Sequence, residues 1–100
     1  MKLAVLASAT DAAAQSEKDE LVRFAQLKQH LAETGVKIDV SLNLLGRYDY
    51  LFIMDIPDGP ENAFRAMSVI AQSGTMRTES FVAMPLDSYF EMAAEIGRAA

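Results

Sequence analysis

Residues 36–44, Val-Lys-Ile-Asp-Val-Ser-Leu-Asn-Leu, decide the fold class because apolar and polar side chains alternate at every position. A period of two places successive side chains on opposite faces of a β-strand. The alternation therefore predicts a strand with one buried face and one face in water. The buried face is predicted to carry Val36, Ile38, Val40, Leu42 and Leu44.

The segments on both sides of this strand have helical periodicity instead. In residues 16–34, leucine and phenylalanine side chains recur near the 3.6-residue period of an amphipathic helix. Ser16 is placed to cap its start, and Gly35 is placed to end it. In residues 60–74, Pro60 suits the first helical position and Gly74 suits the end. The apolar stripe expected to be buried there is formed by Ala63, Phe64, Met67, Ile70 and Ala71.

Three further segments complete the expected topology. Residues 3–7 form a short apolar run, residues 48–56 are apolar on both parities, and residues 75–84 alternate again. A last helix is expected over residues 88–97, after Pro85. The order is strand, helix, strand, strand, helix, strand, which is the ferredoxin-like βαββαβ arrangement of an α+β domain with an added C-terminal helix. We expect one domain over residues 1–100, with its first and third strands at the centre of an antiparallel sheet.

Composition narrows the function classes. The chain has 9 basic and 14 acidic residues and a formal net charge of −5, which disfavours a nucleic-acid partner because such surfaces need clustered Lys and Arg. It has no cysteine, so disulfides and thiolate metal sites are excluded. No apolar stretch approaches the about 20 residues of a membrane span, and residues 3–9 only just reach the length of a signal-peptide core. We therefore expect a cytoplasmic protein without a membrane partner.

The second face of the sheet predicts a partner. Two helices cover one face of a βαββαβ sheet, and the other face meets water or another layer. On the third strand, Asp49, Leu51, Ile53 and Asp55 share one side, which is too apolar to leave exposed. We expect a homodimer or a larger ring, with sheets packed face to face around a closed cavity. The alternative is that the C-terminal helix folds over this face.

A small carboxylate-bearing metabolite is the candidate ligand of that cavity. An arginine would anchor the carboxylate, an acidic side chain would hold an ammonium, and a tyrosine would form the wall. Each candidate also has a structural interpretation. Asp49 would brace the turn at Gly46 or an interface, and the charges of the fourth strand would guard against edge-to-edge aggregation or belong to an interface. The candidate ligand-binding residues are Arg47, Tyr48, Asp49, Tyr50, Arg77 and Glu79.

Catalytic and metal motifs are missing from the sequence. His30 is the only histidine and lies at the edge of a helix's polar face, where a surface role is expected. There is no Gly-x-Ser-x-Gly elbow for a nucleophile and no glycine-rich phosphate loop. We predict no catalytic residue, no metal site and no cofactor.

Two motifs carry a family resemblance. Leu45-Gly46-Arg47-Tyr48-Asp49 before an apolar strand, and Met76-Arg77-Thr78-Glu79-Ser80 later, resemble the GYD-domain family of small bacterial proteins. The resemblance implies a dimeric α+β barrel that self-associates, and it brings no established catalytic residue. A looser pattern is similar to the effector-binding domain of Lrp/AsnC regulators, which binds amino acids at subunit interfaces. The helix-turn-helix of those regulators has no counterpart here.

Three functions stay open at this point. The first is a non-enzymatic module that self-associates and takes a small carboxylate-bearing ligand. The second is a cofactor-free enzyme of the isomerase or monooxygenase type, which dimeric α+β barrels also include, with Asp49, Glu79 and Tyr48 as candidate acids or bases. The third is a structural subunit of a larger complex.

Overall fold

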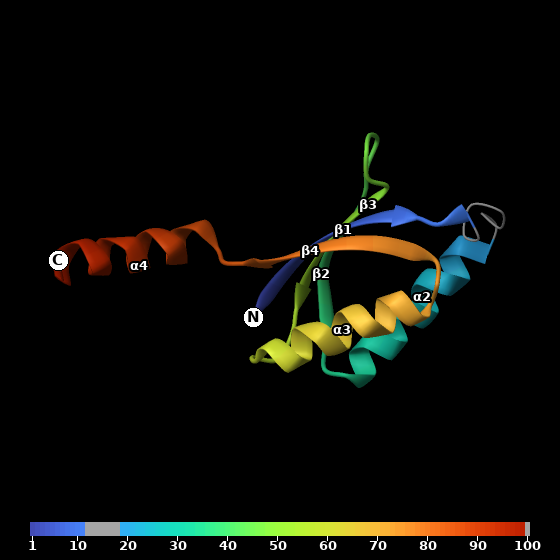
Figure 1. Ribbon diagram of the computed structural model, residues 1–100, viewed down its shortest axis with the longest axis horizontal. Helices are drawn as coiled ribbons and strands as arrows, with labels where there is room; N and C mark the ends of the chain where they lie inside the picture. The colour runs from blue at the N-terminus through green and yellow to red at the C-terminus, as the bar shows by residue number, and fades with distance from the viewer. Residues whose placement is uncertain (12–18, 100) are drawn as a thin grey trace.

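The structure is a computed structural model that describes residues 1–11 and 19–99. Its strands and helices follow the expected order, with the C-terminal helix added at the end (Figure 1). The fold is therefore α+β and ferredoxin-like, as the sequence predicts. The elements are β1 (Lys2–Ala9), α2 (Glu20–Glu33), β2 (Lys37–Asn43), β3 (Tyr50–Asp55), α3 (Pro60–Gln72), β4 (Met76–Ala83) and α4 (Leu86–Ala99).

The four strands form one antiparallel sheet in the order β2-β3-β1-β4. The first and third strands lie at its centre, which confirms the prediction from their continuous apolar character. Helices α2 and α3 lie side by side on one face of the sheet (Figure 1). The other face, which we call the open face, has none of the described helices over it.

The core lies between the two helices and the sheet. Leu3, Val5 and Ala7 of β1 point toward the helices. Leu31 of α2 and Ile70 of α3 belong to the same core and are fully buried. Because β1 side chains alternate, Ala4 and Leu6 must point to the open face. The other core residues are Leu27, Val36, Phe52, Met54, Ile56 and Ala66.

Helix ends follow the sequence signals in part. Gly35 has φ = 82°, and the N–H of Val36 donates to the carbonyl of Leu31 at 3.0 Å, so the chain leaves α2 through a glycine, as expected. Pro60 is the first residue of α3. Ser16, the expected cap of α2, lies outside the described residues. The observed cap is Asp19, which makes no capping hydrogen bond with its side chain.

The predicted wet and dry faces of β2 are wrong beyond its second residue. Ile38 pairs with Met54, but Val40 pairs with Ile53, so Asp39 is an extra residue that forms a β-bulge. The bulge shifts the alternation, and Val40 and Leu42 turn to the open face with 39% and 50% of their surface exposed. The strand that most clearly indicates the fold therefore divides its apolar side chains between both faces.

The last two helices bear on the predictions in different ways. Phe64 was expected in the buried stripe of α3 but is 76% exposed, and Ala66 is buried in its place. Helix α4 runs outward from the end of β4 and leaves the open face uncovered (Figure 1). Its apolar side chains stay exposed, so the alternative in which it folds over its own sheet is not the observed arrangement. Within the described residues, no helix is both long and apolar enough to cross a bilayer.

Candidate functional site

The open face is an apolar surface with charged side chains at both ends. Strand register places Lys2 and Asp55 at one end, and Arg77 and Glu79 toward the other. Lys2 Nζ lies 2.5 Å from Asp39 Oδ2, and this hydrogen bond raises the pKa of Lys2 and lowers the pKa of Asp39. Between the two ends lie the side chains of Ala4, Leu6, Val40, Leu42, Leu51, Ile53 and Phe81.

Tyr48 and Glu79 form a polar pair on this face. The Tyr48 hydroxyl donates to Glu79 Oε2 at 2.7 Å, and the Arg47 guanidinium lies 5.6 Å from the centre of the Tyr48 ring. The hydrogen bond to Glu79 is the main cause that raises the pKa of Tyr48. Tyr48 therefore holds its proton at neutral pH and acts as a donor rather than a base.

Strand parity alone does not place Tyr48. Parity would group it with Tyr50 and Phe52 on the helix side, but β3 begins only at Tyr50, so strand alternation does not extend to Tyr48. Its hydroxyl reaches Glu79, which pairs with Leu6 in the strand register and so lies on the open face.

Arg77 lies beside this pair. It is exposed, pairs with Ser8 in the register of β1 and β4, and shares its face with Glu79 two residues along the strand, a spacing of about 7 Å. The described part of the chain gives Arg77 no hydrogen bond or ion pair. Its guanidinium is therefore available for a carboxylate, which it matches in a bidentate geometry.

Asp49 braces the sheet where β1 ends. Its Oδ2 accepts the backbone N–H of Ala9 at 2.7 Å, its own N–H donates to the carbonyl of Ala7 at 2.9 Å, and its carbonyl accepts the N–H of Leu44 at 2.7 Å. These bonds fix the start of β3 against both neighbouring strands. The geometry thus favours the bracing interpretation of Asp49: its carboxylate fastens β1, and its carbonyl closes the loop of residues 44–49 that contains Gly46.

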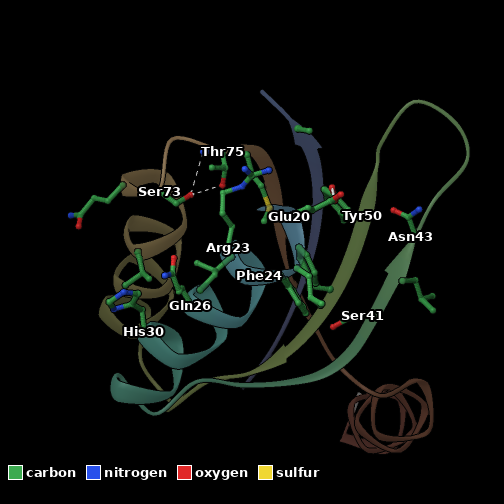
Figure 2. Close-up of a pocket in the computed structure, with 18 of the residues that line it drawn as sticks. Glu20, Arg23, Phe24, Gln26, His30, Ser41, Asn43, Tyr50, Ser73 and Thr75 are labelled. Atoms are coloured by element: carbon green, nitrogen blue, oxygen red, sulfur yellow. Dashed lines mark hydrogen bonds between the residues drawn. The ribbon is translucent and has the colours of Figure 1, made fainter. Parts of the chain in front are cut away.

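Tyr50 lies on the opposite side of the sheet from the other candidates. It lines a cleft of about 840 Å³ beside α2, where its hydroxyl donates to Glu20 Oε1 (Figure 2). Burial, followed by this hydrogen bond, raises the pKa of Tyr50 to about 12. Its ring centre is 6.0 Å from that of Phe52, which is 5.7 Å from that of Phe24.

This aromatic stack was not predicted from the sequence. Tyr50 and Phe52 lie at alternate positions of one strand, and Phe24 belongs to the apolar stripe of residues 16–34. Nothing in the sequence indicates that this helix packs against this strand. Tyr50 is consequently separated from Arg77 and Glu79 by the sheet itself. The site that the geometry brings together consists of Arg47, Tyr48, Arg77 and Glu79.

The structure offers little for a metal. Among residues 1–11 and 19–99, no group of three or more His, Asp or Glu side chains is arranged to hold an ion. His30 is exposed on α2, and its Nδ1 lies 3.8 Å from Glu33 Oε2. Its position agrees with the surface role expected of it.

Comparison with known proteins supports the resemblance carried by the two motifs. No curated protein and no solved structure matches the chain significantly. The family model described as "GYD domain" matches residues 4–93, from β1 into the first half of α4. The match includes both motifs and all four strands, and this chain belongs to the GYD-domain family.

Proposed function

We propose that this protein is a self-associating binding module whose open sheet face packs against the same face of a second copy. A small carboxylate-bearing metabolite binds between the two sheets, at the end that carries Arg77. The apolar open face is the observation that supports this proposal, because a single chain leaves it in water.

The apolar side chains of the face are numerous enough to drive association. Leu42 and Phe81 have 50% and 51% of their surface exposed, and Leu6, Leu51 and Ile53 are half-buried between them. Complete burial of one such side chain contributes about 1.5–3 kcal/mol. Even partial burial of several of them, from both copies, amounts to several kcal/mol. Face-to-face packing at about 10 Å is the usual way in which two sheets achieve this.

The charged end of the face supplies ligand specificity. Arg77 takes the carboxylate of the ligand, and Arg47 adds positive charge above the Tyr48 ring. Glu79 uses Oε2 for Tyr48, which leaves Oε1 for an ammonium group of the ligand. An α-amino acid carries both groups and fits this pairing. Enclosure between two sheets excludes water and strengthens both interactions.

Oligomeric state tests the first part of the proposal. Ile53→Glu places a carboxylate at the centre of the apolar face, where burial without a partner charge is costly. We expect the wild-type chain to be a dimer or larger by light scattering after size exclusion, and Ile53→Glu to be a monomer. Val22→Glu, on the exposed surface of α2, is the matched control and should keep the wild-type mass. A monomeric wild-type chain at micromolar concentration would contradict the proposal.

Calorimetric titration with a panel of amino acids tests the second part. We expect heat of binding from at least one member, and loss of that heat in Arg77→Gln. Arg65→Gln, on α3, removes the same charge on the helix side of the sheet and should bind as the wild type does. Absence of heat from every member of the panel, or equal binding by Arg77→Gln, would refute the ligand assignment.

A further inference from the structure

Helix α4 has an apolar stripe that is left exposed by the part of the chain that the structure describes. Side chains at spacings of three and four residues gather on one side, and the acidic residues Asp87, Glu91 and Glu95 lie on the other. The helix extends away from the sheet and from α2 and α3 (Figure 1). The stripe is formed by Leu86 (65% exposed), Tyr89 (48%), Phe90 (58%), Met92 (39%) and Ile96 (61%).

A helix of this kind requires a docking surface. Isolated helices shorter than about 12–15 residues are marginal in water, and α4 has 14 residues. Most of its stability must therefore come from packing of the stripe. The family match extends to residue 93, so α4 begins within the matched domain.

The chain carries a groove of matching character. It lies between α3 and the helix-side face of β1 and β4, has a volume of about 510 Å³, and contains no charged side chain among its described lining. Phe64 and Val82 at its rim are 76% and 73% exposed, which are large values for apolar residues of a helix and a strand. The exposure of Phe64, unexpected from its helical stripe, thus belongs to an unfilled groove.

The connection before α4 directs it away from its own groove. Only Met84 and Pro85 separate β4 from α4, and a residue before proline is restricted to extended backbone. The helix therefore continues outward from the strand instead of reversing onto Val82. Its own groove is left open at the same end of the sheet from which the helix departs.

We propose that α4 is an exchanged arm, which seats its apolar stripe in the α3–β4 groove of a second copy while the partner's arm fills the first copy's groove. This inference goes beyond the proposed function, because the groove lies on the helix side of the sheet whereas the face-to-face contact uses the open face. The arm has 14 residues and is about 21 Å long, close to the length of the 13-residue helix α3 that forms one wall of the groove.

Cross-linking of introduced cysteines tests the exchange, since the chain has no cysteine of its own. The variant Phe64→Cys with Phe90→Cys places one thiol in the groove and one on the stripe, at two exposed positions that leave the core intact. After treatment with a short bismaleimide, we expect a covalent dimer as the main species on a denaturing gel. Each single variant, and the control pair Val22→Cys with Phe90→Cys, should stay largely monomeric on the gel.

The possible outcomes separate this inference from the proposed function. An internally bridged monomer would mean that α4 occupies its own groove, and it would overturn the exchange. No bridge in a chain that light scattering identifies as a dimer would also overturn the exchange but leave the sheet-to-sheet dimer standing. No bridge in a monomeric chain would refute both. Adding Ile53→Glu to the double-cysteine variant should leave the covalent dimer in place, because the exchange does not use the open face; its loss would contradict the exchange.

Discussion

Replacing Asp49 with alanine measures the bracing role of its carboxylate. Oδ2 of Asp49 accepts the Ala9 N–H at 2.7 Å, and both residues are half-buried. A hydrogen bond to a charged acceptor contributes about 1.5–3 kcal/mol. Water reaches a half-buried N–H in part, so we expect Asp49→Ala to lower the free energy of unfolding by about 1–2 kcal/mol. Asp49→Asn keeps an oxygen acceptor and should lose less than about 1 kcal/mol.

Urea denaturation followed by circular dichroism is the appropriate assay. Every variant is measured at one protein concentration, because the stability of a self-associating chain depends on its concentration. In a thermal scan, the same loss corresponds to a melting temperature lower by roughly 4–16 °C for Asp49→Ala. Glu95→Ala, on the polar face of α4, is the control and should stay within about 0.5 kcal/mol of the wild type. If Asp49→Ala unfolds with the wild-type free energy, the hydrogen bond does not brace the sheet and the reasoning fails.

Three further predictions concern stability and its pH dependence. Leu31→Ala, at a fully buried core position, should lower the free energy of unfolding by about 2–5 kcal/mol in urea, whereas Leu45→Ala in an exposed loop should change it by less than about 0.5 kcal/mol. Because the pKa of Tyr50 rises from 10.0 to about 12 on folding, the wild type should lose stability as the pH rises from 10 to 12, and Tyr50→Phe should lose less; equal losses would contradict this. Because Lys2 lowers the pKa of Asp39, Asp39→Asn should be less stable than the wild type at neutral pH, and the difference should vanish as the pH falls through 3.8 and below in acid titrations of both chains.

The order of elements was predictable because periodicity and punctuation agree along the chain. Pro60 begins α3 and Gly35 follows α2 for local reasons that do not depend on the rest of the molecule. The central position of β1 and β3 followed from their apolar residues on both parities. These signals are short-range, and a single sequence contains them in full.

Features that depend on contacts between distant segments were not predictable. The bulge at Asp39 arises from the pairing of β2 with β3, and nothing in the alternation of residues 36–44 reveals it. Phe64 occupies a helical position suited to burial, but β4 is at the sheet edge and none of the described helices or strands covers Phe64 there. The candidate site divides for the same reason, since Tyr48 and Tyr50 are two residues apart yet face opposite sides of the sheet.

The extra residue in β2 has a consequence for how related chains are aligned. Asp39 acts as a spacer in the alternation of apolar and polar residues. Apolar side chains before it face the helices, and apolar side chains after it face the open side of the sheet. Deleting this spacer would restore regular pairing and still leave Val40 and Leu42 facing outward, whereas deleting Ser41 would turn Leu42 inward. In a relative that lacks residue 39, the apolar side chains of the open face would occupy the other set of alternate positions, counted from the start of the strand. Counting alternate residues alone would then assign them to the wrong face of the sheet.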